Sequence, residues 1–328
     1  MYSFINYLRT IATILITNSH YANIWPISAL AAGGLLGNIL FFAASGFCLF
    51  NVKENFIKWY AKRIVRIYPV MIAFTLLTVC IGDYALKSWT DARWLFLFPT
   101  NYPFLAWLML AYIAFYIVAW LSKKYDKCPE VSLLFIVVAW LIVYFVFIDK
   151  SVYCIDNVEK PFILFLYFAS MLMGALFKKH KEQFSKVKKS RVLLLFLSIA
   201  VYFGSKVIFS KVKEVVFWQI LNQLTILAVL YFTFVVFLGL ENKLKQLPSW
   251  LNRLVEFLSK ITLHIYIVQF VLIRRLEGLM FPLNFVLTTA AILAAASALY
   301  ATEYFIRKGV SYLVDKIKKE KQDAKSND

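Results

Sequence analysis

The sequence predicts an all-α integral membrane protein, a bundle of about ten transmembrane helices with both the N and C termini in the cytoplasm. Three observations support this fold class: the composition, the length of the apolar runs and the placement of positive charge between them. Hydrophobic residues make up 62% of the 328 and charged residues 16%, whereas soluble domains have about 45–50% and ~25%. The mean hydropathy is +0.70. A bilayer is the solvent that accommodates such an apolar surplus.

Ten apolar runs have close to the ~20 residues that a helix needs to cross a bilayer. The runs at 66–82 and 161–177 are short, and Lys206, Lys211 and Lys213 blur the boundary between the seventh and eighth. The expected spans are 5–24, 28–50, 66–82, 104–121, 131–148, 161–177, 192–210, 217–238, 256–273 and 281–303.

The connecting segments differ in positive charge. One alternating set carries 25 Lys and Arg residues and the other carries 8. Cytoplasmic segments are the ones enriched in Lys and Arg, so the richer set, which includes the C-terminal tail, is predicted to be cytoplasmic. The net charge of +18 is then explained by cytoplasmic segments that face anionic lipid. The bilayer is the expected partner, and no nucleic-acid partner is expected.

The domain organisation follows from these spans. We expect one transmembrane domain over 1–310 and a charged cytoplasmic tail over 311–328, frayed from Asp315 onward. A cleaved signal peptide is the alternative for the first 30 residues, but a polar and aromatic stretch, 18–28, separates its apolar core from the would-be cleavage site. The four cysteines predict neither a disulfide framework nor a metal site.

Arg9 and His20 are ionisable residues in the first apolar run. Eleven residues at ~100° each place them on the same helical face, about 16 Å apart along the axis. Such groups in a span usually face a polar cavity or a partner. The alternative is interfacial snorkelling for Arg9 and a structural hydrogen bond for His20. Position alone does not separate the two interpretations.

The next two segments carry further candidate features. Residues 41–50, FFAASGFCLF, contain small residues around Ser45 that favour close helix packing. Residues 56–68 form an amphipathic pattern, predicted to lie on the cytoplasmic surface before Pro69 begins the third span. Arg63 and Arg66 would present two guanidinium groups to one side, which suits phosphate oxygens. Anionic lipid headgroups are the competing ligand.

Several weaker polar features lie later in the chain. Three amides in the eighth run share a helical face and are interpreted as hydrogen bonds between helices: Gln219, Asn222 and Gln223. His180 is expected to be simply solvated. The ninth run and the end of the tenth carry four further polar residues: His264, Tyr266, Gln269 and Glu303.

Taken together, the N-terminal motifs resemble the acyltransferase-3 family of membrane O-acyltransferases, most strongly over residues 5–75. The family pattern of arginine, ten residues and histidine matches Arg9 to His20, and a phenylalanine-rich stretch ending in Ser-Gly-Phe matches Phe41 to Phe47. The pattern Arg-x-x-Arg-Ile-x-Pro matches 63–69. A looser match, LSKITLHIYIVQ, covers 258–269 and retains four residues: Lys260, Ile261, Ile265 and Tyr266.

The match also departs from the family in places. Gln269 stands where the family usually has histidine, Ser259 replaces the usual glycine, and Asn6 replaces a frequent acidic residue. These departures weaken any inference about the acceptor.

The resemblance implies an enzyme that moves an acyl group, usually acetyl, from cytoplasmic acyl-CoA to a sugar hydroxyl of a cell-surface or lipid-linked glycan. The expected location is the plasma (inner) membrane of a bacterium. Acyl-CoA is a donor substrate, and no bound cofactor or metal is expected. Succinyl or longer acyl groups stay open.

On this resemblance we predict His20 as the catalytic base; an acyl-histidine intermediate is the alternative route. The predicted donor-binding or substrate-binding residues are Arg9, Arg63, Arg66, Ser45, Asn18, Ser19 and Tyr266, with the two serines and Asn18 as possible oxyanion donors. Two rival functions are a glycan exporter and an inert subunit of a polysaccharide synthase. An exporter would favour inverted repeats with Gly or Pro breaks, and none is found in the sequence.

Overall fold

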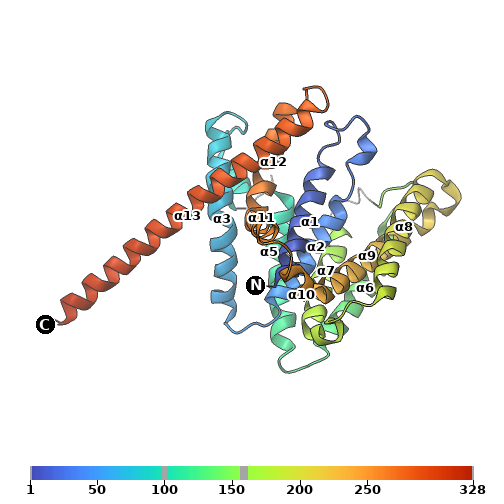
Figure 1. Ribbon diagram of the computed structural model, residues 1–328, viewed down its shortest axis with the longest axis horizontal. Helices are drawn as coiled ribbons and strands as arrows, with labels where there is room; N and C mark the ends of the chain where they lie inside the picture. The colour runs from blue at the N-terminus through green and yellow to red at the C-terminus, as the bar shows by residue number, and fades with distance from the viewer. Residues whose placement is uncertain (1, 98–101, 156–161, 327–328) are drawn as a thin grey trace.

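The computed structural model describes residues 2–97, 102–155 and 162–326, and all regular structure within these ranges is helical. The first residue of the predicted span 161–177 therefore lies outside the described residues. The elements, labelled in Figure 1, are α1 Ser3–Ser19, η1 Ser28–Leu30, α2 Gly34–Leu49, α3 Phe56–Cys80, α4 Trp89–Ala92, η2 Arg93–Leu97, α5 Pro103–Leu121, α6 Cys128–Phe147, α7 Phe162–Lys179, η3 Lys181–Phe184, α8 Lys189–Lys211, η4 Lys213–Trp218, α9 Ile220–Gly239, α10 Glu241–Lys245, α11 Ser249–Lys260, α12 Thr262–Leu276 and α13 Leu283–Ser326.

Eight helical segments of the described chain are long and apolar enough to cross a bilayer. α11 and α12 pass the same test as a pair, although the chain bends by 67° between them. α1 has 17 residues, at the lower limit for a span. The protein is therefore an all-α, multi-pass membrane protein, and the full count of ten spans stays a prediction.

The N-terminus of α1 lies at one end of the bundle beside two distant segments. Glu241 accepts hydrogen bonds from the backbone N–H groups of Ser3 (3.1 Å) and Phe4 (2.8 Å), and so satisfies donors that an α-helix leaves unpaired at its start. Lys178 at the end of α7 donates to the Tyr2 hydroxyl at 3.1 Å. We call this the basic end, because segments predicted to be cytoplasmic meet here; its exposure to the cytoplasm stays a prediction.

The opposite end gathers the segments from the less basic set. Arg275 at the end of α12 forms an ion pair with Asp83, which follows α3, at 2.9 Å. Asn23, in the connection after α1, donates to Glu277 at 3.0 Å. The alternation of chain ends predicted from charge therefore agrees with the contacts made at both ends of the bundle.

The predicted surface helix over 56–68 is wrong as a separate element. α3 is continuous from Phe56 to Cys80, with Pro69 inside it. One side of this stretch packs on protein, because Trp59 is buried against the rings of Tyr112 (5.9 Å) and Tyr116 (5.2 Å) on α5, whereas Ile57 and Ile64 are exposed. Proline is tolerated inside membrane helices when neighbours compensate for the missing backbone bond.

α2 and α7 cross in direct backbone contact, which explains the small residues of 41–50. A Cβ atom on Gly46 would collide with the Met171 carbonyl of α7, and one on Gly174 would collide with the Ala43 carbonyl of α2. Both contacts are to backbone, so neither side can move aside as a flexible side chain would. The glycines thus fix the approach of two helices at the centre of the bundle (Figure 1).

Replacing Gly46 or Gly174 by alanine is expected to lower the thermal unfolding temperature of the detergent-solubilised protein, because each added methyl group meets backbone. Overpacking of this kind costs about 1–3 kcal/mol or more. Gly204→Ala is the matched control, since a Cβ there meets nothing within 4 Å and alanine is the better helix former by roughly 0.5–1 kcal/mol. Equal melting temperatures for the three variants would contradict the packing assignment.

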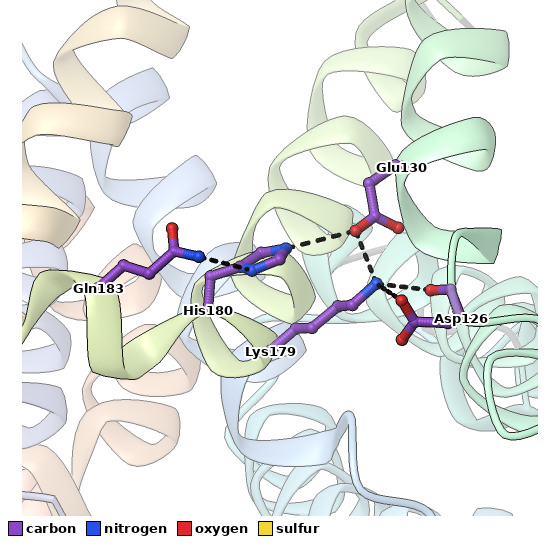
Figure 2. Close-up of polar contacts among 5 residues, drawn as sticks. All are labelled: Asp126, Glu130, Lys179, His180 and Gln183. Carbon is purple, nitrogen blue, oxygen red and sulfur yellow. Dashed lines mark hydrogen bonds and ion pairs between the residues drawn. The ribbon is translucent and has the colours of Figure 1, made fainter.

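A polar cluster joins α6 to the end of α7 (Figure 2), which corrects the expectation of a solvated His180. The Lys179 ammonium contacts the carboxylates of Glu130 (2.8 Å) and Asp126 (2.9 Å). His180 Nε2 lies 3.3 Å from Glu130, and Gln183 lies 3.5 Å from the other ring nitrogen. α6 and α7 pack side by side in opposite directions, so the start of α6, with Asp126 and Glu130, lies beside the end of α7.

The buried amides of α9 serve structure, as interpreted from the sequence. Gln219 Oε1 accepts from the backbone N–H groups of Cys154 and Ile155, both at 2.9 Å, and Gln223 Nε2 donates to the Ile155 carbonyl at 2.9 Å. Asn222 Nδ2 donates to the Tyr202 carbonyl at 2.9 Å. These bonds hold α9 against α8 and the segment before α7.

The C-terminal helix is longer than expected. α13 has 44 residues and leaves the bundle as a straight rod toward the C-terminus (Figure 1). The helix includes the predicted tail, 311–328, through Ser326, and residues 327–328 lie outside the described range; fraying from Asp315 stays a prediction. Its many Lys, Glu, Gln and Ala residues are strong helix formers, which accounts for the difference.

Candidate functional site: a basic cavity inside the bundle

A cavity of about 850 Å³ lies between α1, α2, α3, α5, α11, α12 and the middle of α13. This volume falls within the range of small-molecule and cofactor sites. At the basic end its lining includes the exposed side chains of Lys62, Glu256 and Lys260, so the cavity reaches the surface there. At the other end the lining stops at Thr17 of α1 and Gln269 of α12.

Three of the predicted binding residues bring positive charge into this cavity: Arg9, Arg63 and Arg66 all line it. Among the described residues, the guanidinium groups of Arg9 and Arg66 have no hydrogen-bond or ion-pair partner, and they are close enough to interact electrostatically. Two unpaired like charges in one cavity repel each other and are stabilised by an anion between them. The arrangement is therefore suited to binding an anionic ligand.

Arg63 is held differently from the other two. Its Nη1 donates to the Trp59 carbonyl at 2.6 Å, and its guanidinium lies 4.1 Å from the centre of the Trp59 ring. Stacking on an aromatic ring fixes the plane of a guanidinium and leaves its remaining N–H groups free for a ligand.

Lys62 sits at the mouth of the cavity with its ammonium paired to Glu54, which lies just before α3. The hydrogen bond from Lys62, together with its charge and those of Arg63 and Lys58, lowers the pKa of Glu54. The carboxylate therefore stays ionised at neutral pH.

Ser45 and Tyr266 also line the cavity, as predicted for substrate-contacting residues. Tyr266 projects from α12 into a group of aromatic rings, with Phe104 at 5.5 Å, Phe270 at 5.7 Å and Tyr102 at 6.3 Å. Its position in the wall is thus set by rings from α5 and α12.

The structure does not bring Asn18, Ser19 and His20 into the cavity lining. Asn18 Nδ2 donates to the carbonyls of Leu30 (2.8 Å) and Ala32 (3.0 Å), and its Oδ1 accepts from Trp25 Nε1 at 2.9 Å. Asn18 therefore fastens the connection between α1 and α2.

Ser19 donates to the Ile16 carbonyl at 2.7 Å, and a Cβ on Gly34 would collide with its hydroxyl. Its hydrogen is thus committed within α1, under the first residue of α2. Two of the three predicted oxyanion donors therefore already have structural partners, and only Ser45 faces the cavity.

His20 caps the C-terminal end of α1, three residues beyond Thr17, where the lining ends. One residue of helix rises 1.5 Å, so this separation is about 4.5 Å along the axis. The His20 side chain is exposed, and its ring lies 4.6 Å from the ring of Phe270. Phe270 also contacts Tyr266, so one aromatic side chain connects His20 to the wall of the cavity.

The outer end of the cavity is closed by a hydrogen bond from Thr17 Oγ1 to Gln269 Oε1 at 2.8 Å. Gln269 is fully buried, and its Nε2 has no partner among the described residues. Sequence reasoning noted this position as a polar residue of the ninth run and as a departure from the family, without a role. Burial of a polar residue within an apolar run was the available signal.

Sequence reasoning also missed the pairing of His264 with Glu303. His264 Nε2 lies 2.8 Å from the Glu303 carboxylate, both residues line the cavity, and His264 Nδ1 is buried without a partner among the described residues. The two residues are 39 apart in sequence, on α12 and α13, so only the tertiary fold shows them together. Both are ionisable groups in apolar runs, which is the signal that marked them individually.

Within the described residues, no group of three or more His, Cys, Asp or Glu side chains is placed to hold a metal ion. Fold and cavity together define a multi-pass membrane protein with an internal cavity lined by three arginines. A family model described as an acyltransferase domain matches residues 2–302. The chain therefore belongs to the acyltransferase-3 family of membrane acyltransferases. No curated protein and no solved structure matches it.

Proposed function

We propose that this membrane acyltransferase transfers an acyl group, acetyl in the first instance, from cytoplasmic acyl-CoA to a hydroxyl of a cell-surface or lipid-linked glycan in a bacterial plasma membrane. The observation that carries the proposal is the pair of partnerless guanidinium groups, Arg9 and Arg66, in a cavity that opens at the basic end. Acyl-CoA is an anionic, phosphate-rich donor that would enter from this side.

The extent of the cavity lining, from the exposed Lys62 and Lys260 at the basic end to Thr17 and Gln269, supports a long donor. The phosphates would bind at the mouth, beside Arg63 and Arg66, with Arg9 deeper. The pantetheine arm is long and thin and would follow the cavity toward Gln269, which places the thioester at the outer end of the lining. From there His20 is one helical turn away, on the side from which an extracytoplasmic hydroxyl would approach.

The proposed reaction is a direct transfer. His20 accepts the proton of the acceptor hydroxyl while the hydroxyl oxygen bonds to the thioester carbonyl carbon. The tetrahedral intermediate then collapses, the carbon–sulfur bond breaks, and CoA leaves as its thiolate. The last turn of α1 and Phe270 would have to admit the acyl carbonyl for this step.

Deleting the gene and measuring polymer amount and polymer acylation separately tests the function. We expect acyl groups to disappear while the amount and length of the polymer stay unchanged. Loss of surface polymer with polymer retained inside the cell would instead identify an exporter. A fall in total polymer synthesis would identify an inert partner of a synthase.

A direct assay complements the deletion. Full-length protein in lipid nanodiscs is incubated with labelled acetyl-CoA and envelope glycan from the deletion strain. Transfer of label to glycan, dependent on the protein, is the expected result. Transfer from succinyl-CoA in preference to acetyl-CoA would change the acyl group but not the reaction.

A further inference from the structure

Gln269 places an unused hydrogen-bond donor at the outer end of the cavity. The residue is 0% exposed, lines the cavity, and has no partner for Nε2 among the described residues. The large majority of buried side-chain polar atoms in proteins have a partner, and an unpaired one is costly. Because Gln269 lines the cavity, an oxygen atom of a bound ligand is an available acceptor for this N–H.

The orientation of the amide is fixed by its other end. Thr17 Oγ1 donates to Gln269 Oε1 at 2.8 Å, so Oε1 is bonded to α1 and Nε2 is the atom without a partner in the described part of the chain. Because Thr17 and Gln269 are the outermost residues of the lining on their helices, this donor lies at the part of the cavity nearest to His20.

We propose that Gln269 stabilises the tetrahedral intermediate of acyl transfer by donating a hydrogen bond from Nε2 to its oxyanion. This inference rests on the proposed function. When the hydroxyl oxygen bonds to the thioester carbon, the carbonyl π electrons move onto oxygen, and the resulting negative charge is the acceptor for Nε2. Gln269 forms no covalent bond and exchanges no proton. The charge returns to carbon as the carbon–sulfur bond breaks.

The role fits the positions of the other candidates. Asn18 and Ser19 have their donors committed to backbone carbonyls. Ser45 lines the cavity on α2 and can contribute a second donor. Preorganised donors of this type contribute most when the site excludes water and their orientation is fixed in advance. The hydrogen bond from Thr17 restrains the orientation of the Gln269 amide.

Two substitutions separate this role from a structural one. Gln269→Met keeps the volume and removes both the donor and the acceptor. Thr17→Val removes only the bond that Gln269 makes to α1. Gln269→Met is expected to lower kcat for acetyl transfer by about 10²–10³-fold, with the Kd for acetyl-CoA within about twofold of wild type. Gln269→Glu is expected to keep part of the activity, because a buried carboxyl is protonated and its O–H can donate in place of Nε2. If Gln269 only anchored Thr17, Thr17→Val would lose as much activity as Gln269→Met.

The assay uses full-length protein in nanodiscs, labelled acetyl-CoA and glycan from the deletion strain, with acetyl-CoA binding measured on the same samples by calorimetry. Gln246→Glu, at an exposed position before α11, is the control for added charge. Thr17→Val removes the orienting bond and is expected to reduce kcat about tenfold.

The outcomes distinguish this inference from the proposed function. Inactive wild-type protein would overturn the function itself. Active wild type with Gln269→Met retaining more than half of kcat would overturn the oxyanion role alone. Loss of acetyl-CoA binding in parallel with kcat would also overturn it, because the residue would then serve binding. If Gln269→Met does not fold, Gln269→Leu decides on the same criteria.

Discussion

His20→Ala is expected to abolish acyl transfer while leaving expression and acetyl-CoA binding near wild type. A positioned general base contributes about 10²–10⁴-fold to a proton transfer, and His20 is the imidazole on the acceptor side of the cavity in our proposal. Because its side chain is exposed and contacts chiefly Phe270, its removal leaves the packing of α1 intact. The measurement is label transferred from acetyl-CoA to glycan by protein in nanodiscs.

His180→Gln provides the matched control, since the chain has three histidines and this one lies in the polar cluster of Figure 2, away from the cavity. Its activity should stay within about twofold of wild type. Near wild-type transfer by His20→Ala would refute His20 as the base. Loss of activity on replacing His264 in that case would point to the His264–Glu303 pair instead.

Arg9→Ala combined with Arg66→Ala is expected to raise the Kd for acetyl-CoA by about 100-fold or more. Each change removes a hydrogen bond between charged groups, worth about 1.5–3 kcal/mol, and 1.4 kcal/mol corresponds to a factor of ten. Arg66→Ala alone should mainly raise the apparent KM for the donor. Neither guanidinium has a protein partner among the described residues, so their loss leaves no buried carboxylate unpaired.

Two measurements distinguish donor phosphates from lipid headgroups as the ligand of these arginines: the Kd for acetyl-CoA and the association of the protein with anionic lipid vesicles. Lys58→Ala on the exposed side of α3 is the control for general loss of positive charge and should leave the Kd unchanged. An unchanged Kd in the Arg9 and Arg66 variants, with weaker association with anionic lipid vesicles, would assign the arginines to the membrane surface and remove the main support for the donor site.

The helices were predictable because apolar runs of near span length are a local property of the chain. Each of the ten predicted runs corresponds to a helix or, for 256–273, to the bent pair α11–α12. The bend at Ile261 and the continuity of α3 through Pro69 depend on tertiary packing. A proline after a basic amphipathic stretch favours a break in the helix. Here the helix continues, and Trp59 in its first part packs against α5.

The candidate site was predictable in part for the same reason. Arg9, Arg63, Arg66, Ser45 and Tyr266 lie on short motifs, and all five line the cavity. The partners of Asn18 are backbone carbonyls in an irregular connection, and Glu303 pairs with a residue 39 positions earlier. Periodicity carries no information about either. The roles assigned to the cavity residues stay predictions until the variants are measured.

The Glu241 cap on α1 has a consequence for biogenesis. The amides of Ser3 and Phe4 acquire these acceptors only when a segment some 238 residues later has been synthesised and inserted. Until then the first helix, which carries Arg9, enters the bilayer with open amides at its start. A nascent chain that stops before residue 241 would therefore lack this cap, and water at the membrane surface would have to serve as the acceptor for the two amides.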